Sequence, residues 1–419
     1  MKHNNSWYAK SVSLDRYRWM QLRERHGLGG SLLRFCRDAV VDIWLGILAK
    51  ARLRSITETS PCDILLLQSA PFVIGLKRKK LLIEAIAHRG YQLTETALDK
   101  PQIICQKRLL APPPQAVPLR YFFYAAHATW LVAHHQPKIL LNDRNGSLYS
   151  PFLRLCLNEK NSLLVQLAHA STLESSRRLG MNDYDYYILF GRSSFEALMN
   201  RRLRFGSTTA LITGSHMIDT AFDIPPPKFD CKTILVLGIG PDKEKETGYL
   251  NTYNIIYNAT KYLSGYKILI KRHPRSSIPF WENASKTSDN IILLAPDHSL
   301  AKALSRSSIV VNIMSNAVIE ATLAGRPIIY CNTSDNIDIF EQERFFGPAA
   351  NTLEKFNSRL IEIENNYAKE IDNAKKFSQY HLAHGTDGLK KNMEVIDCLL
   401  TGSVLPNEIE QHSLYSTIK

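Results

Sequence analysis

The sequence predicts an α/β protein made of two tandem Rossmann-like domains, with a helical extension before them. Short apolar, β-branched runs alternate with segments of helical periodicity in two successive series, which is the pattern of parallel sheets covered by helices. Three prolines at 225–227 separate the two series near the middle of the chain. Two such halves are expected to face each other across a cleft lined by the carboxyl ends of their strands.

Length and composition support a globular protein of about two domains with an anionic partner. The chain has 419 residues, of which 45% are hydrophobic and 22% charged, and 52 Lys and Arg stand against 39 Asp and Glu. This net charge of +13 favours nucleic acid, anionic lipid or a phosphorylated substrate. Zinc-finger spacing, an RNA-binding aromatic strand and a helix-turn-helix pattern are all missing from the sequence, so we do not expect nucleic acid.

The cysteines and the apolar runs favour a cytoplasmic location. The seven cysteines are scattered singly without a C-x-x-C pair, which fits a reducing compartment. The polar amino terminus lacks a signal-peptide core, and no apolar run reaches the length of a spanning helix. We therefore expect a cytoplasmic protein that can lie peripherally on the inner face of a membrane.

The extension at 1–60 combines helical apolar periodicity with positive charge. Apolar residues recur at helical spacing between Leu32 and Leu48, flanked by arginines and lysines. The extension holds 11 Lys and Arg against 5 Asp and Glu, an excess of six positive charges. One interpretation is a basic amphipathic helix on an anionic membrane surface. The other is a helix packed on the first domain with a solvated basic side.

The first Rossmann-like domain is predicted over 61–224. Strands are expected at 63–67, 138–141, 162–167, 186–190 and 210–215, and helices at 77–89, 119–134 and 148–157. The run Lys77-Arg78-Lys79-Lys80 is unusual because cations oppose the positive end of a helix. It indicates either a site for a polyanionic acceptor or lipid head groups, or a solvated turn.

The second Rossmann-like domain is predicted over 225–400, followed by a frayed tail at 401–419. Strands are expected at 232–237, 267–270, 290–294, 309–313 and 327–331. Helices are expected at 249–263, 300–306, 353–377 and 388–400.

Two residues of the first domain are candidates for a general base. His169 follows the apolar strand at 162–167, and the reference pKa of histidine suits proton transfer at neutral pH. Asp143 lies in the polar loop after the strand at 138–141. The alternation of strand and helix places both loops at the same edge of the sheet. Either residue can be the base, and a structural histidine at a strand end is the plain alternative.

The second domain has a basic cluster where its strand at 267–270 ends. His273 can donate a hydrogen bond to a phosphate, Lys271 and Arg272 add positive charge, and Pro274 fixes the turn. A histidine that only caps the strand end is the alternative.

A second anion-binding turn is predicted after the strand at 309–313. Ser315 and Asn316 precede a short helix, so a hydroxyl and several backbone N–H groups are expected to converge on a phosphate. Glu320 can reach a ribose hydroxyl, and a solvated or salt-bridged glutamate is the alternative. Gly238 and Gly240 permit close approach of a ligand to the backbone, although G-x-G lacks the third glycine of a dinucleotide fingerprint.

These motifs together resemble the GT-B glycosyltransferases of bacterial surface polysaccharide biosynthesis. The group includes the capsule-polysaccharide and CDP-glycerol glycerophosphotransferase-like enzymes and the bacterial sialyl- and polysialyltransferases. The resemblance covers roughly residues 60 to 400. It is carried by the segments 165–169, 185–191, 212–215 with Asp219, 271–274, 315–316 with Glu320, and 325–327.

The resemblance implies a metal-independent transferase that needs no cofactor. It would take a nucleotide-activated donor, CMP- or CDP-linked, and a polysaccharide or glycolipid acceptor. His273 would assist the departing phosphate, and Ser315 would bind it. The sequence departs from the family at Ala170, where the polyol-phosphate transferases have glycine, and at Asn316, where they have a second serine. The acidic-acidic-glycine base motif of the sialyltransferases is also missing.

Two other functions fit the same architecture. One is a UDP-sugar 2-epimerase-like enzyme, which would convert its substrate without an acceptor. The other is a catalytically silent GT-B-like protein that binds nucleotide or polysaccharide.

Overall fold

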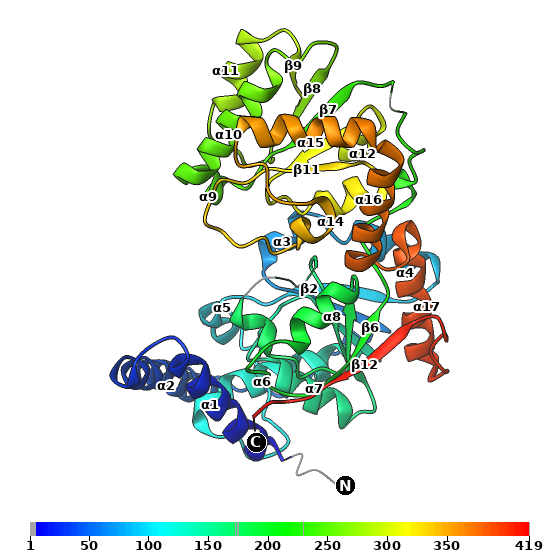
Figure 1. Cartoon of the computed structure of the whole chain (residues 1–419). Coiled ribbons are helices and arrows are strands. Elements are labelled where there is room, and N and C mark those ends of the chain that lie inside the picture. Colours follow the sequence, from blue (N-terminus) through cyan, green and yellow to red (C-terminus); the bar gives the residue numbers. More distant parts are fainter. Residues whose placement is uncertain (1–5, 172, 174–175, 229, 419) are drawn as a thin grey trace. The chain divides into compact units, whose positions relative to one another are not determined.

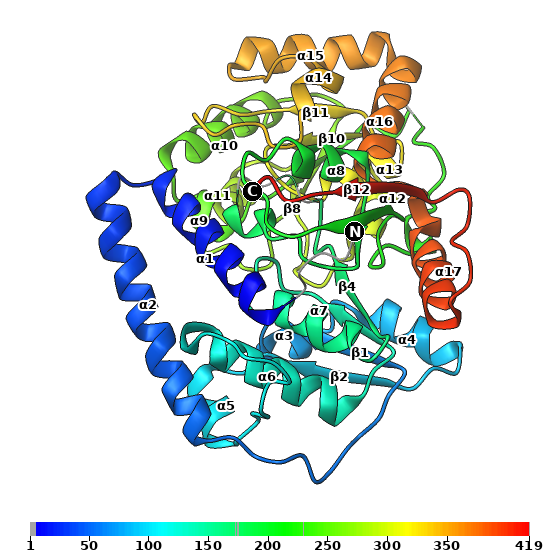
Figure 2. The same cartoon turned by 90° about the horizontal axis from the view of Figure 1, so that it is seen from below.

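The computed structural model describes residues 6–171, 173, 176–228 and 230–418 (Figures 1 and 2). The chain divides into two compact units, and each is described by itself. Unit 1 contains residues 1–217 together with 388–419, and unit 2 contains residues 218–387.

Unit 1 is built on a seven-stranded sheet of order β12-β6-β5-β4-β3-β1-β2. Six strands run parallel, and only β12 is antiparallel to its neighbour β6. The strands are β1 (Ile64–Gln68), β2 (Leu93–Ala97), β3 (Ile139–Asn142), β4 (Leu163–Leu167), β5 (Tyr186–Leu189), β6 (Thr208–Ile212) and β12 (Glu410–Leu414). The chain order reverses between β1 and β3, so the crevice that binds ligands in such sheets lies at the carboxyl ends of these two strands.

Helices cover both faces of this sheet, which explains why its central strands are continuously apolar. Alternate strand residues such as Ile64 and Val165 pack with Leu82 of α4 and Ile396 of α17 in one buried cluster. The helices of unit 1 are α1 (Trp7–Arg23), α2 (Leu28–Ala51), α3 (Pro71–Gly75), α4 (Lys80–His88), α5 (Pro101–Gln106), α6 (Leu119–His135), α7 (Ser150–Asn158), η1 (Arg177–Gly180), α8 (Arg192–Met199) and α17 (Gly388–Thr401).

Unit 2 is built on a five-stranded parallel sheet of order β11-β10-β7-β8-β9. Its strands are β7 (Thr233–Leu237), β8 (Lys267–Lys271), β9 (Ile291–Leu293), β10 (Ile309–Asn312) and β11 (Ile328–Tyr330). The chain order reverses between β7 and β10, so the expected crevice of this unit lies where these two strands end.

The helices of unit 2 bury the apolar faces of that sheet. Figure 1 shows α10 and α15 together over one face, where Tyr253, Ile256 and Phe356 join Val236 and Val311 in a buried cluster. The helices are η2 (Thr220–Phe222), α9 (Pro241–Glu244), α10 (Thr247–Thr260), α11 (Phe280–Thr287), α12 (Leu300–Ser305), α13 (Val318–Leu323), α14 (Gln342–Phe346), α15 (Leu353–Asn365), α16 (Tyr367–His381) and η3 (Gly385–Asp387).

The carboxyl-terminal boundary predicted from sequence is wrong. The segment after 387 returns to unit 1 because Val395 and Ile396 of α17 pack into the core of that sheet. The predicted tail at 401–419 is not frayed throughout, because β12 pairs with β6 along its whole length, from Glu410 opposite Ile212 to Leu414 opposite Thr208.

The other predicted strands lie close to those observed. The strand β2 and the helix α1 were not predicted, because neither has a regular apolar pattern. The edge strand β2 is only half-buried and reads Leu-Thr-Glu-Thr-Ala, so it lacks the apolar run that marks the central strands. Helix α1 was not predicted because polar residues interrupt its apolar positions. The helix expected at 353–377 is two helices that meet at Asn366.

The helices of the predicted extension belong to unit 1. Trp7 of α1 is fully buried against Phe152 of α7, with 5.9 Å between the ring centroids. Helix α2 lies along α6 (Figure 2). None of the helices in the described part of the chain is long and apolar enough to cross a membrane.

Candidate functional site

The two candidate bases of unit 1 meet at the carboxyl edge of its sheet. Asp143 directly follows β3 and His169 lies two residues beyond β4, and these strands are parallel neighbours. The Nδ1 atom of His169 lies 3.1 Å from Oδ1 of Asp143. The Asp143 side chain is only 2% exposed, whereas that of His169 is 41% exposed. The sequence offered them as alternatives, and the structure brings them together as a pair.

A buried lysine completes this group. The Nζ atom of Lys79 lies 3.2 Å from Oδ2 of Asp143, and the Lys79 side chain is 2% exposed. Burial lowers the pKa of Lys79, and the Asp143 carboxylate opposes this shift. The cation at the start of α4 is therefore not in a solvated turn, although its neighbours Lys77, Arg78 and Lys80 are exposed. The unusual charge at a helix start was the sequence signal for this residue.

A second histidine, which is fully buried, lies next to the lysine. His216 is fully buried, and its Nε2 atom lies 3.4 Å from Nζ of Lys79. Burial and the nearby charge of Lys79 hold the pKa of His216 well below its ordinary value. His216 is therefore neutral at physiological pH, so it adds no second positive charge beside Lys79. No motif in the sequence pointed to this residue.

The exposed side of His169 lines a cavity of about 340 Å³. The cavity lies at the reversal of strand order, since Ser69 follows β1 and Arg144 follows β3. Its other described lining residues are Asn145, Ser176, Arg178 and Leu179. Two arginines and several hydroxyl or amide groups give this cavity the polar, cationic character that suits an oxygen-rich anionic ligand.

The loop that carries Asp143 is held by buried polar contacts. The Asn145 side-chain oxygen accepts hydrogen bonds from Gln166 Nε2 at 3.0 Å and from the Tyr187 hydroxyl at 3.2 Å. Gly146 has a φ of +64°, and a Cβ there would lie 2.5 Å from the backbone of Arg178. Glycine at this position lets the two walls of the cavity approach each other.

In unit 2, His273 lies just beyond β8, as the sequence predicted. Its Nδ1 atom accepts a hydrogen bond from the backbone N–H of Arg275 at 3.1 Å. A neutral imidazole with an accepting Nδ1 carries its proton on Nε2, so Nε2 can donate to a phosphate oxygen. Pro274 is exposed in the turn between these two residues.

A buried glutamate shapes the loop after His273. Glu244 is 1% exposed and accepts from the Ser276 hydroxyl at 2.7 Å and 2.8 Å. It also accepts from the Ser277 backbone N–H at 3.3 Å and from the Tyr253 hydroxyl at 3.3 Å. A buried carboxylate with several donors fixes its neighbours strongly. No feature of the sequence marked Glu244 for this role.

The two glycines after β7 have different surroundings. A Cβ on Gly238 would lie 2.8 Å from the backbone nitrogen of His273, so this glycine lets two protein loops pack closely. Nothing lies within 4 Å of a Cβ built on Gly240. A ligand could therefore approach the backbone at Gly240, whereas Gly238 is needed so that the His273 loop can pack against it.

The expected surplus of positive charge beside His273 is smaller than the sequence suggested. Arg272 forms an ion pair with Glu282 of α11, which offsets its charge. Lys271 donates to the Pro296 carbonyl at 3.1 Å, and burial lowers its pKa while Asp297 opposes that shift. The side chain of His273 is thus the clearest candidate for a phosphate donor at this strand end.

The turn after β10 also differs from the prediction. The helix α13 has Ala317 at its N-cap position, and Ser315 instead accepts from the Ala317 N–H at 3.3 Å. The backbone N–H groups of Ser315, Val318 and Ile319 also donate within this turn. Most of the expected amides are therefore engaged, and the Ser315 hydroxyl and the exposed Asn316 side chain are left as candidate contacts.

Glu320 in the first turn of α13 has an unusual environment. Its Oε2 atom is buried and has no hydrogen-bond partner in the described chain. Burial raises the pKa of Glu320 from 4.5 to about 7. At neutral pH this carboxyl is close to half protonated, so it can either donate to or accept from a ribose hydroxyl.

We expect Glu320→Gln to raise the unfolding free energy at about pH 8 by about 1–3 kcal/mol. In wild type the unfolded chain releases this proton near pH 4.5 and the folded chain only near pH 7, so stability falls as pH rises through that window. Glutamine cannot ionise and avoids this loss. Chemical denaturation between about pH 5 and 8 measures it, with the exposed Glu354→Gln as the control. An unchanged pH slope in Glu320→Gln would contradict the assignment.

The arginine of the Gly325-Arg326-Pro327 motif is structural. Arg326 is 2% exposed and donates to the carbonyls of Leu304 at 3.0 Å, Ser307 at 3.1 Å and Pro225 at 3.0 Å. Burial lowers its pKa to about 10. Its hydrogen bonds connect the first residues of unit 2 to the loop before β10, and its side chain does not line the crevice.

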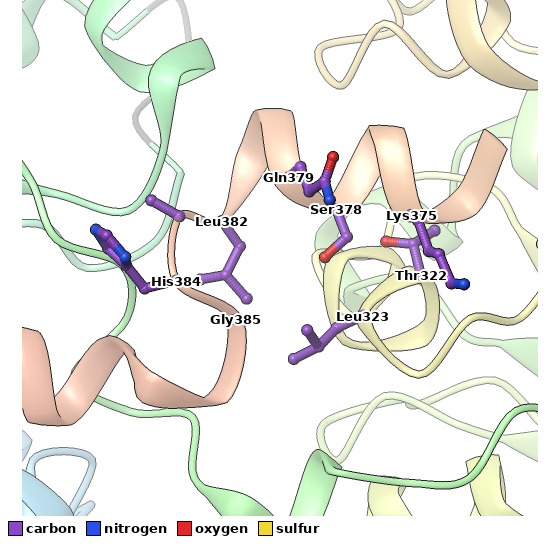
Figure 3. A pocket seen from close by; sticks show the side chains of 9 residues that line it. Thr322, Leu323, Lys375, Ser378, Gln379, Leu382, His384 and Gly385 are labelled. Atoms are coloured by element: carbon purple, nitrogen blue, oxygen red, sulfur yellow. The ribbon is translucent and has the colours of Figure 1, made fainter. Parts of the chain in front are cut away.

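A larger cavity of unit 2 lies away from these residues. It measures about 370 Å³ and lies between α13, α16 and the turn that follows α16 (Figure 3). Lys375 and His384 are the basic side chains in its lining, and Leu323 belongs to the end of α13 opposite Ser315. None of the predicted site residues lines it. In the described parts of the chain, no group of three or more His, Cys, Asp or Glu side chains could hold a metal ion.

Comparison with known proteins shows the fold. No family model and no curated protein matches the sequence. A putative UDP-N-acetylglucosamine 2-epimerase from Listeria monocytogenes has 12% identity and a TM-score of 0.54, covering 82% of this chain and 98% of that chain. The UDP-GlcNAc 2-epimerase from Neisseria meningitidis bound to UDP-GlcNAc has 12% identity and a TM-score of 0.51, covering 80% and 99%. The wall teichoic acid polymerase TagF has 11% identity and a TM-score of 0.47, covering 88% and 97%.

The chain therefore has a GT-B-like fold of two Rossmann-like units, as the sequence predicted. The helices α1 and α2 precede this fold.

Proposed function

We propose that this protein is a glycosyltransferase of the GT-B type that acts in the assembly of a surface polysaccharide or glycolipid. It would move a sugar or a polyol phosphate from a nucleotide-activated donor, CMP- or CDP-linked, to an acceptor hydroxyl. The observation that carries the proposal is the pair formed by the half-exposed His169 and the buried Asp143 at a polar cavity. A carboxylate behind a histidine is the arrangement of a general base.

The base would act through the outer nitrogen of the imidazole. Asp143 lies beside Nδ1 of His169 and favours the tautomer with the proton there, which makes Nε2 the basic nitrogen. Nε2 would take the proton of the acceptor hydroxyl as its oxygen attacks the donor. Asp143 would stabilise the resulting imidazolium, and the ion pair with Lys79 would hold Asp143 in place. The cationic lining from Arg144 and Arg178 suits an acceptor that carries phosphate or carboxylate groups.

Unit 2 would hold the donor by its phosphates. The Nε2–H of His273 would donate to the departing phosphate, together with the Ser315 hydroxyl and the Asn316 amide. Hydrogen-bond donors fixed in advance stabilise charge that develops on a leaving group. Glu244 keeps the His273 loop in position for this role. Glu320 is the candidate for the ribose, and Lys271 and Arg272 contribute at longer range.

A UDP-sugar 2-epimerase-like activity is the second candidate. The observation in its favour is that the similar structures from Listeria monocytogenes and Neisseria meningitidis, both with TM-scores above 0.5, carry the names of such epimerases. At 12% identity these structures establish the fold and leave the reaction open. An epimerase would convert a UDP-sugar with no acceptor present, whereas a transferase would release nucleotide only with an acceptor. A catalytically silent binding protein would do neither and would still bind nucleotide.

Nucleotide binding tests the proposal first. Bound nucleotide raises the unfolding temperature by mass action, so a thermal-shift screen with CMP, CDP, UDP and GDP identifies the preferred base. We expect CMP or CDP to give the largest shift. A shift with UDP alone, together with acceptor-free conversion of a UDP-sugar, would favour the epimerase.

A further inference from the structure

Helix α2 fully buries only small or polar residues and leaves most of its large apolar residues exposed. The residues that it buries are Ser31, Asp42, Gly46 and Ala49. A Cβ on Gly46 would lie 1.9 Å from the backbone oxygen of Leu119, so the helix is packed directly against the start of α6. In a helix that only completes a protein core, the large apolar side chains face inward. The orientation of α2 is the reverse.

An ion-pair cluster fixes this orientation. Asp42 accepts from Arg18 of α1 at 2.6 Å and from the Tyr124 hydroxyl of α6 at 3.0 Å, and its Oδ2 lies 3.5 Å from Nε of Arg120. The guanidinium of Arg120 lies 4.2 Å from the centre of the Phe35 ring. A buried carboxylate shared by two arginines and a tyrosine cannot turn to solvent without losing these partners. Rotation of α2 to bury its apolar side is therefore costly.

The outer side of α2 is apolar along its length. Eight large hydrophobic side chains of the helix are between 38% and 75% exposed. We call them the outer face of α2: Leu28, Leu32, Leu33, Val40, Val41, Ile43, Trp44 and Ile47. Figure 2 shows α2 at the margin of unit 1, with α6 on one side and no described element of unit 1 over the other. A contiguous patch of this kind marks an interaction surface.

The charges around the outer face are positive. Exposed Arg34, Arg37 and Lys50 lie on the helix, and Arg52 and Arg54 follow it. The acidic residues of α2 do not balance them fully. Asp38 pairs with Arg37 and lies near Arg18, and Asp42 is buried in the cluster described above. The face therefore combines apolar side chains with a basic border.

We propose that the outer face of α2 binds an anionic lipid bilayer, with the helix lying in the plane of the membrane surface. Apolar side chains would enter the acyl boundary, the basic border would meet the lipid phosphates, and Trp44 would sit at the headgroup level. The 24 residues of α2 give a contact about 36 Å long. This inference is independent of the proposed transferase activity.

Charge favours a bilayer over a second copy of this chain. A two-fold dimer would place the same face against itself, so that the basic border of one copy would approach the basic border of the other. Like charges brought together at an interface oppose association. An anionic membrane complements both the apolar side chains and their basic border.

Flotation of the full-length protein with vesicles tests this inference. We expect wild type to float with phosphatidylcholine vesicles that contain about 30% phosphatidylglycerol, and to float poorly with phosphatidylcholine alone, because the basic border needs anionic lipid. Val40→Ser/Trp44→Ser/Ile47→Ser should lower binding by about tenfold or more. Arg34→Gln/Lys50→Gln should also weaken it, and high salt should reproduce that loss.

The matched control replaces exposed apolar residues elsewhere. Tyr262, Ile337 and Val404 are between 82% and 89% exposed, so their triple change to serine removes similar surface outside α2. This control should float as wild type does, and all variants should keep the wild-type unfolding temperature. The inference is overturned if wild type does not float at low salt or if the α2 triple variant floats unchanged. Self-association that depends on Val40, Trp44 and Ile47 without vesicle binding would assign the face to a second copy and also overturn it.

Discussion

Replacing His169 by alanine is expected to lower kcat by about 10²- to 10⁴-fold, because general-base catalysis contributes this much to proton transfer. The imidazole lines the cavity, and Asp143 behind it is buried and paired with Lys79. Donor binding should change little, because the donor phosphates are assigned to unit 2. Steady-state kinetics with the donor found in the nucleotide screen, together with nucleotide affinity, separate these two effects.

Two further variants identify the role of the pair. Asp143→Asn keeps the shape of the side chain but removes the charge that stabilises the imidazolium, so it should lower kcat with a small change in the KM of the acceptor. His88→Ala removes an exposed histidine at the end of α4 and should behave as wild type. If His169→Ala retained kcat within a few-fold of wild type, the histidine would be structural and the base would have to be found elsewhere.

Replacing His273 by alanine is expected to lower turnover of the donor by about 10²- to 10³-fold, the effect of losing one fixed donor to a developing negative charge. The hydrogen bond from Arg275 to Nδ1 orients the ring so that Nε2 carries the donated proton. Single-turnover rates with saturating donor measure the chemical step without product release.

The conservative variant separates charge stabilisation from loop structure. His273→Gln keeps an N–H donor and should lose less activity than His273→Ala, while both should unfold at the wild-type temperature because Glu244 and Ser276 still hold the loop. Equal turnover in wild type and His273→Ala would remove this residue from the mechanism.

The sequence predicted the sheet edges well because parallel strands covered on both faces leave a strong signal. The apolar runs of β3 and β4 placed Asp143 and His169 at one edge, and the structure places their side chains 3.1 Å apart. Their cooperation could not be predicted, because alternation fixes which edge a loop occupies and leaves the distance between side chains open. Lys79 was visible only as a cation in an unfavourable position at a helix start.

The surroundings of the proposed phosphate-binding residues in unit 2 were predicted with less accuracy, because their interactions are local. The partner of Arg272 is Glu282 on the following helix, and the amides after β10 are used by the turn itself. A sequence pattern shows that donors are present but not which of them the protein already uses. Of the basic residues predicted to bind phosphate, Arg272 and Lys271 already have partners in the protein, so His273 is the main candidate that is left.

The ends of the chain show the same limit. The periodicity of α2 predicted a helix with an apolar side, but only the Asp42 cluster shows that this side faces outward. The return of α17 and β12 to unit 1 depends on contacts distant in the sequence, with Ile396 packing beside Ile64 and Leu82. The orientation of α2 and the position of α17 and β12 are determined by tertiary contacts, so the local sequence pattern does not predict them.

Nucleotide binding to wild type and to His273→Ala decides whether unit 2 has a nucleotide site. We expect CMP or CDP at about 1 mM to raise the unfolding temperature of wild type, since ligand well above its dissociation constant contributes a few kcal/mol by mass action. The same nucleotide should give a much smaller shift with His273→Ala and a full shift with His169→Ala. An absence of any shift with CMP, CDP, UDP and GDP, or an equal shift in wild type and His273→Ala, would contradict a nucleotide site at the end of β8.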